Sequence, residues 1–254
     1  MHPAVQTTSS AIRNWRIGFI VASTLFSTSL IAQDPPANLI KRVAAVETAA
    51  QQAQSNYTYR QSVAVEELDN HGSVVGQYRE LRDIIFSPTE KRTEQFIGSP
   101  MKTLKNLKLT DEDFRDIREI QPFLLTTEQA FMYESRFRGE ENMDGVDCYV
   151  LQIRPRQILD GQRLFDGNIW VDKHDFSVVR SEGQAVPQII TTKSENLFPH
   201  FTTIRQKIDG EYRFPVTTYA NDTLYFRSGA QRIRLMIRYS EYKKFGSDTK
   251  ITFH

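Results

Sequence analysis

From residue 56 onward, most of the chain alternates between apolar and polar residues, and this period of two constrains the fold more than any other feature. On one face of the segment 231–242 (QRIRLMIRYSEY) lie Ile233, Leu235, Ile237 and Tyr239, while arginines take the other face. Successive side chains of a strand point to opposite faces, so the segment predicts a strand with one buried and one wet face. Such strands are typical of antiparallel sheets.

About ten segments carry this alternation, and short turn signals separate them. Asp-Gly pairs, which favour hairpin turns, stand at 144–145, 160–161, 166–167 and 209–210. The order of segments favours a meander of antiparallel hairpins and not a series of parallel βαβ units. Because a twisted antiparallel sheet of this size tends to curl, we expect an α+β fold that is mainly antiparallel β, with about ten strands in a curled, unclosed barrel.

Two stretches have the period of a helix instead. In residues 38–54, Leu39, Val43, Val46, Ala50 and Ala53 form one apolar stripe. Residues 101–134 form a helical insert, in which Thr110 and Asp113 resemble a capping box and Pro122 ends the helix. Residues 126–137 could form a second short helix or lead into a strand. We expect the leading helix and the insert to cover the concave face of the sheet.

The first 32 residues have the layout of a secretory signal peptide. Arg13 and Arg16 precede a short apolar run that ends at Ala32. The run is shorter than the ~20 residues that a membrane-spanning helix needs, although an uncleaved anchor is the alternative. Cleavage would leave residues 33–254 as one domain in the periplasm, with no integral membrane segment.

Charge and cysteine usage exclude some functions. The net charge is +1, and it becomes −1 without residues 1–32, which hold two arginines and no acidic residue. No basic excess is left to neutralise phosphates, so we expect no nucleic-acid partner. Cys148 is the one cysteine in the sequence. An internal disulfide is therefore excluded, and we expect a packed thiol.

Catalytic and metal-binding motifs are missing from the sequence. No two of the five histidines have the spacing of metal ligands, and there is no Gly-x-Ser-x-Gly nucleophile turn or phosphate-binding glycine loop. The segment Asp172–Asp175 (DKHD) could be a proton-transfer site, but aspartates that bond back to their own backbone also suit a tight turn, which we favour. We expect no catalytic residue, metal or cofactor, and an envelope hydrolase built on Asp172 and His174 is the least favoured hypothesis.

Aromatic residues crowd the carboxy-terminal half of the chain. Ordinary sheet core explains most of them, but some could line a cavity for an acyl chain, since such a site needs apolar surface and few polar groups. The candidate lining residues are Tyr149, Leu151, Phe165, Trp170, Phe176, Phe214, Phe226 and Leu235.

Several segments resemble the periplasmic lipoprotein carriers of the outer-membrane lipoprotein-sorting (LolA-like) superfamily. These are ANLIKRVAAVETAAQQAQ followed by NYTYRQSVAVEE (37–67), VDCYVLQIRP (146–155), GNIWVDKHDFSVVRSEG (167–183) and KIDGEYRFPVTTYAND (207–222). The resemblance implies an unclosed antiparallel barrel, helices over an apolar cavity, and binding of acyl chains or lipoproteins without catalysis or cofactor. The chain departs from the carriers in its larger insert at 100–140, and it has no clear match to their buried arginine that holds the lid.

Two hypotheses for function follow. The first is a non-enzymatic periplasmic carrier of lipid or lipoprotein cargo, and it predicts a continuous apolar cavity under the leading helix. The second is a cell-envelope module that binds a protein partner through its sheet face or its insert. That hypothesis predicts a filled core and an exposed apolar patch.

Overall fold

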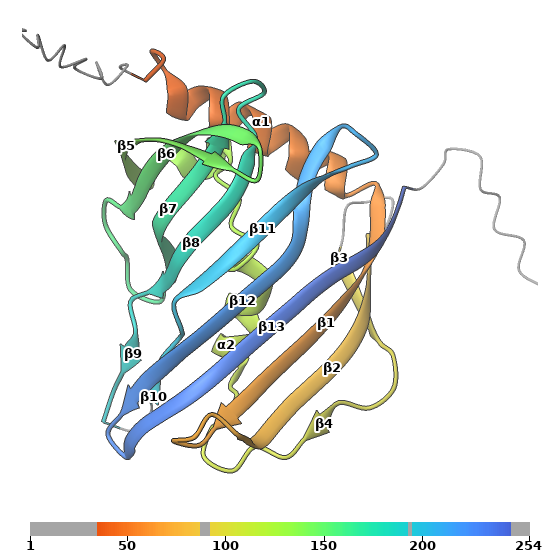
Figure 1. Cartoon of the computed structure of the whole chain (residues 1–254), viewed down its shortest axis with the longest axis vertical. Helices are drawn as coiled ribbons and strands as arrows, with labels where there is room; N and C mark the ends of the chain where they lie inside the picture. The colour runs from red at the N-terminus through yellow and green to blue at the C-terminus, as the bar shows by residue number, and fades with distance from the viewer. Residues whose placement is uncertain (1–34, 87–91, 193–194, 245–254) are drawn as a thin grey trace, which may run out of the picture. The chain divides into compact units, whose positions relative to one another are not determined.

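One large antiparallel sheet organises the chain (Figure 1). The computed structural model describes residues 35–86, 92–192 and 195–244. The strands of this sheet are β1 (Tyr57–Leu68), β2 (Val74–Phe86), β3 (Arg92–Phe96), β4 (Met101–Lys102), β5 (Tyr133–Met143), β6 (Val146–Pro155), β7 (Leu164–Asp172), β8 (Val178–Val186), β11 (Phe201–Ile208), β12 (Tyr212–Phe226) and β13 (Gly229–Lys244). A separate small hairpin joins β9 (Ile189–Ile190) to β10 (Glu195–Asn196).

The strand order is β3-β2-β1-β13-β12-β11-β8-β7-β6-β5, with β4 beside β2. Its ends, β3 and β5, do not pair with each other, so the sheet is not closed into a barrel. This confirms the predicted mainly antiparallel, unclosed sheet. Most neighbours are hairpin partners, but β1 pairs with β13 from the far end of the sequence.

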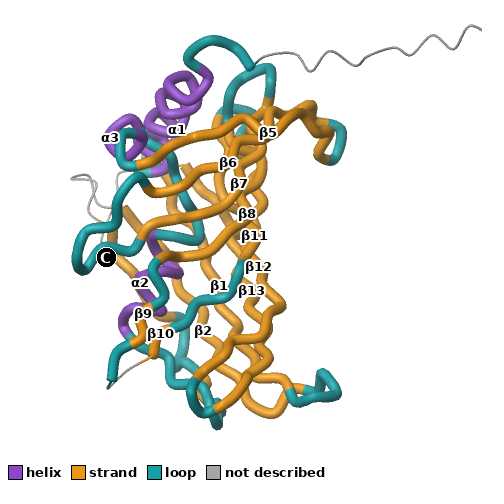
Figure 2. The backbone as a smooth tube through the Cα atoms, turned by 90° about the vertical axis from the view of Figure 1, so that its left-hand side faces the viewer, coloured by secondary structure: helices purple, strands orange, loops and turns teal. Residues whose placement is uncertain are grey.

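Three helices lie on one side of the sheet (Figure 2). The predicted leading helix is confirmed as α1 (Leu39–Gln54), which buries Leu39, Val43, Ala44 and Ala50. In α2 (Asp111–Glu119) the predicted capping box is present, since Thr110 and Asp113 bond reciprocally. The insert also holds β4 and the four-residue α3 (Thr127–Ala130), and β5 begins at Tyr133, so residues 126–137 contain both a helix and a strand.

The main hydrophobic core lies between the helices and the concave face of the sheet. A smaller cluster joins Cys148, Val150, Trp170 and Val179, which come from β6, β7 and β8. These residues alternate with the core residues Leu151 and Ile169 along the same strands, so they lie on the opposite face of the sheet.

The predicted signal peptide, residues 1–32, lies outside the described residues.

Candidate functional site

A cavity of about 440 Å³ lies between the concave face and the insert. Strand residues from β1, β12 and β13 form one wall, and α2, residues 106–109 and residues 195–199 form the others. The apolar lining consists of Val65, Leu107, Leu109, Ile117, Leu197, Phe198, Pro199, Leu224, Phe226, Ala230, Ile233 and Leu235. The lining includes no residue of α1. We expected a cavity under the leading helix, but this cavity lies under the insert.

One buried carboxylate fixes the wall formed by residues 105–107. Glu67 of β1 is fully buried and accepts hydrogen bonds from the backbone N–H groups of Lys105 and Asn106, both at 2.7 Å, and of Leu107. The Asn106 amide also donates to Gln231 Oε1 at 2.9 Å. Hydrogen bonds to a charged acceptor are stronger than neutral ones. This segment is therefore held in place without filling the cavity with its own side chains.

A buried polar cluster fixes α2. Arg163 lies 2.6 Å from the carboxylate of Asp116 and donates to Asn196 Oδ1 at 2.6 Å. Asn196 in turn donates to the Thr110 hydroxyl, at 3.1 Å. Burial raises the pKa of Asp116 to about 7, although Arg163 opposes the shift. Burial also raises the pKa of Asp113, against the hydrogen bonds from Thr110. The helix that covers the cavity is thus attached by ionisable groups.

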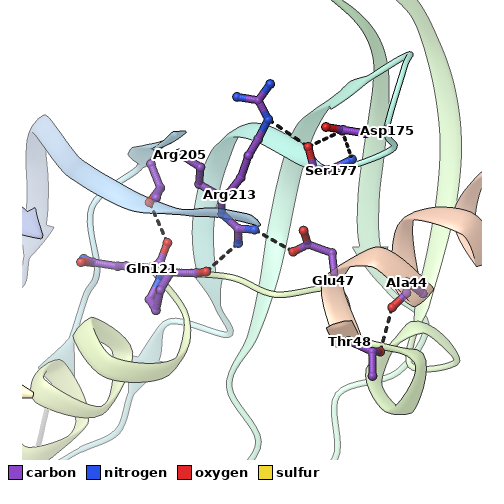
Figure 3. Close-up of polar contacts among 10 residues, drawn as sticks. Ala44, Glu47, Thr48, Gln121, Asp175, Ser177, Arg205 and Arg213 are labelled. Atoms are coloured by element: carbon purple, nitrogen blue, oxygen red, sulfur yellow. Dashed lines mark hydrogen bonds and ion pairs between the residues drawn. The ribbon is translucent and has the colours of Figure 1, made fainter. Parts of the chain in front are cut away.

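A second buried ion pair joins both helical segments to the sheet. Arg205 of β11 donates to Glu47 of α1 at 2.7 Å (Figure 3). It also donates to the carbonyl oxygen of Pro122, after α2, at 2.7 Å. Arg205 and Glu47 are each 1 % exposed. The neighbouring Thr203 hydroxyl donates to the Gln121 carbonyl at 2.6 Å. One arginine therefore ties three separate parts of the chain together.

Sequence analysis missed Arg205 and Glu47. The spacing of residues in β11 contained the signal, because Arg205 lies two and four residues after the buried Thr203 and Phe201 and so shares their face of the strand. Glu47 lies one turn after Val43, so it shares the buried side of α1. Two charged residues at buried positions of two elements would have predicted an ion pair between them.

Two of the eight predicted lining residues, Phe226 and Leu235, line the cavity. Leu151, Phe165 and Phe176 belong to the main core, and Tyr149 packs against it. Phe214 lies in a cluster with Tyr57, and the ring centroids are 5.2 Å apart. Trp170 packs against Cys148 on the other face of the sheet and donates to Glu141. Ligand binding at any of the eight stays a prediction.

The segment Asp172–Asp175 is a turn, as the favoured interpretation predicted. Asp172 Oδ1 accepts the backbone N–H of His174 at 2.8 Å, and Asp175 Oδ1 accepts that of Ser177 at 2.9 Å. The other Asp172 oxygen pairs with Arg213, also at 2.8 Å. The His174 side chain is exposed. The two residues proposed for a hydrolase are therefore engaged in a turn and not in a proton-transfer pair.

Other chemistry is sparse in the part of the chain that the structure describes. There, no group of His, Cys, Asp and Glu side chains could hold a metal ion. No helix among the same residues is long and apolar enough to cross a membrane. The Cys148 thiol is buried, and burial raises its pKa to about 11. Because the thiolate is the nucleophilic form, this thiol is inert at neutral pH.

Fold and site together define a protein with an open antiparallel sheet and a helix-covered cavity that has both apolar and polar side chains in its lining. No protein-family model and no curated protein matches the sequence. Solved structures that match include a DUF1329 family protein from Desulfovibrio piger, with 14% identity, a TM-score of 0.38, and coverage of 87% of this chain and 96% of that one.

Two further matches are described by the names of the superfamily that several segments of this sequence resemble. A LolA superfamily protein from Nitrosomonas europaea has 15% identity and a TM-score of 0.33, over 83% of this chain and 98% of its own. An outer membrane lipoprotein-sorting protein domain from Vibrio parahaemolyticus has 11% identity and a TM-score of 0.35, over 80% and 93%. With TM-scores below 0.5, these matches carry no argument about function, which has to come from the cavity itself.

Proposed function

We propose that this protein is a non-enzymatic carrier or binding protein of the periplasm. It holds an acyl chain, or the lipid group of a lipoprotein, in the cavity between α2 and β13. The observation that supports this proposal is the cavity of about 440 Å³, which has apolar side chains on every wall beside polar ones such as Asn106, Asp113 and Glu195. Cavities that bind small ligands measure about 300–1,000 Å³ and are mostly apolar.

The polar groups around the cavity fit a binding role. Glu67 and the Arg163–Asp116 ion pair bind groups of the cavity walls, so they fix the shape of the cavity. Binding energy would then come from burial of the ligand's apolar surface, at about 0.8 kcal/mol per methylene group. A carrier needs this kind of contact, which does not depend on the ligand's head group.

Uptake of the apolar fluorophore N-phenyl-1-naphthylamine by the delipidated protein tests the proposal. Gln231 lines the cavity, is only half-buried and lies on the same face of β13 as Ile233 and Leu235, so Gln231→Trp should narrow the cavity without disturbing the core. We expect this variant to bind the fluorophore at least tenfold more weakly than the native protein does. Ser240→Trp, at an exposed position of the same strand outside the cavity lining, is the matched control. Absence of uptake by the native protein, or equal uptake by both variants, would contradict the proposal.

A cell-envelope module that binds a protein partner is the second candidate. It is favoured by exposed apolar side chains near the β3 edge, where Phe96 is 51 % exposed, Ile97 39 % and Met101 42 %. The same fluorophore separates the candidates. A carrier takes it up in the cavity that Gln231→Trp narrows, whereas an interaction module binds it only at the surface, where Phe96→Ser would weaken binding.

A further inference from the structure

A row of polar side chains crosses the concave face beyond the inner end of the cavity. We call it the polar row, and its members, in strand order, are Arg82, Gln61, Tyr239, Thr218, Thr203 and Ser181. They come from β2, β1, β13, β12, β11 and β8, and each is at most 5 % exposed. The row therefore runs across six neighbouring strands inside the protein.

Strand register places half of the row directly side by side. Gln61 pairs with Arg82 on one side and with Tyr239 on the other. The Tyr239 hydroxyl lies 3.4 Å from the Thr218 hydroxyl, which carries the row across to β12. Burial is the largest cause of the raised pKa of Tyr239, so the hydroxyl stays neutral across the physiological range.

Strand register also places the other half of the polar row side by side. Thr203 pairs with Thr218 and with Ser181, and the two threonine hydroxyls are 2.8 Å apart. The segment after α2 covers this half, because Thr203 also donates to the carbonyl of Gln121. Gln121 is itself fully buried, so it is the cover of the polar row.

The row lies just beyond the cavity. Val65 and Leu235 are paired and line the cavity. The next pair inward, Val63 with Ile237, is buried and apolar, and the pair after it is Gln61 with Tyr239. No member of the polar row lines the cavity. A single apolar layer therefore separates the end of the cavity from the polar row.

Several atoms of this region have unused hydrogen-bonding capacity. Among the described residues, Gln61 Oε1, Ser181 Oγ and both amide atoms of Gln121 have no hydrogen-bond partner. These atoms are already shielded from water, and a methylene group that reaches them cannot bond to them, so the contact offers nothing in return for opening the buried Val63–Ile237 layer. A bound apolar chain that extended inward as far as the polar row would therefore gain no binding free energy from its last methylene groups.

We propose that the polar row limits the length of the apolar chain that the cavity accepts. The inference rests on the proposed function. The side chains of β13 that face the cavity run from Gln231 to Leu235, which is roughly 14 Å of strand. The ligand class is accordingly a medium-length acyl group, about as long as dodecanoyl, and a hexadecanoyl chain gains no affinity from its extra methylenes.

A series of saturated fatty acids from octanoate to hexadecanoate tests the limit, through displacement of N-phenyl-1-naphthylamine from the full chain. Up to dodecanoate, we expect each added methylene to tighten binding about fourfold, the equivalent of about 0.8 kcal/mol. Beyond dodecanoate we expect no further tightening. This measurement uses the native protein, so it does not depend on how any variant folds.

The double variant Gln61→Leu with Gln121→Leu then identifies the cause. Leucine has a similar size and removes amide atoms without partners, so the fold should tolerate both changes. In this variant we expect tightening to continue to hexadecanoate, which should bind at least tenfold more tightly than it binds the native protein. Gln206→Leu, at an exposed position of β11, is the matched control and should keep the native limit.

Each outcome is decisive. Tightening that continues to hexadecanoate in the native protein overturns the length limit. A limit that stays at dodecanoate in the double variant shows that the polar row is not its cause and also overturns the inference. If no fatty acid of any length binds, the proposed function itself fails, which is a different result from either of these.

Discussion

Single buried charges decide how the helices attach to the sheet. Arg205 gives one bond to Glu47 of α1 and one to the Pro122 carbonyl, and neither charged side chain reaches solvent. Removing one partner of a buried ion pair costs about 3–5 kcal/mol, because the other charge is left buried without compensation. The pair therefore acts as a unit, and the losses of stability caused by replacing Arg205 and by replacing Glu47 should not be additive.

We expect Arg205→Met alone to lower the free energy of unfolding by about 3–5 kcal/mol. Adding Glu47→Leu removes the stranded carboxylate, so the double variant should be more stable than Arg205→Met. Urea unfolding of both single variants and the double variant measures the coupling. If the two single losses simply add in the double variant, the ion pair is not the reason for the loss.

Asp116 predicts an unusual dependence of stability on pH. Burial raises its folded pKa from 3.8 to about 7, so the folded protein holds a proton that the unfolded chain has already released between these values. The stability contributed by this group is fully present below about pH 4, and it is lost as the pH rises through about 7. Buried carboxylates in ion pairs with lowered pKa values have the opposite dependence.

Asp116→Asn should remove this contribution. Between about pH 4 and pH 7, the native protein should lose stability relative to the variant, by at most about 1.4 kcal/mol per pH unit, the value for one proton. Urea unfolding of both proteins across this range gives the difference. Parallel curves would mean that Arg163 keeps Asp116 ionised in the folded protein at all of these pH values.

At the scale of elements, one carboxylate holds a stretch of irregular backbone. Three consecutive N–H groups, of Lys105, Asn106 and Leu107, point at Glu67. Glu67→Gln keeps the shape but removes the charge, and each bond should weaken by about 1 kcal/mol. We expect hydrogen exchange at these three amides to become at least tenfold faster.

Glu66→Gln is the matched control for that experiment. Glu66 is the neighbouring residue of β1, but it pairs with Arg79 and Arg234 on the other face of the sheet. In the Glu66→Gln variant, the hydrogen-exchange rates of the amides of residues 105–107 should equal those of the native protein. Unchanged rates in Glu67→Gln itself would show that the segment is held by other contacts.

The elements differ in how far the sequence predicts them. Long strands such as β1 and β13 follow from their period of two, and α2 follows from the Thr110–Asp113 capping box, since these signals are local. The four-residue α3 has too few residues for a helical period to appear. The position of Trp170 on the outer face also escaped prediction, because a strand period separates the two faces but does not say which face meets the main core.

At the scale of the whole molecule, the fold class could be predicted and the site could not. The cavity brings together Val65, Ile117 and Leu235, from three distant parts of the sequence. Only the pairing of β1 with β13 places Val65 beside Leu235, and no local pattern encodes that pairing. The crowding of aromatic residues in the carboxy-terminal half is a signal of composition alone, and most of those rings are buried in one of three hydrophobic clusters.

The pairing of β1 with β13 also fixes an order of events during synthesis. A growing chain makes β1 and β2 early, and both can form a hairpin at once. The other edge of β1 must then wait until almost the whole sequence has been made, since its partner is the last strand described. Contacts between such distant residues slow folding, and an unpaired edge can join another chain. Until β13 pairs with it, the free edge of β1 is therefore the place where the growing sheet could join another chain.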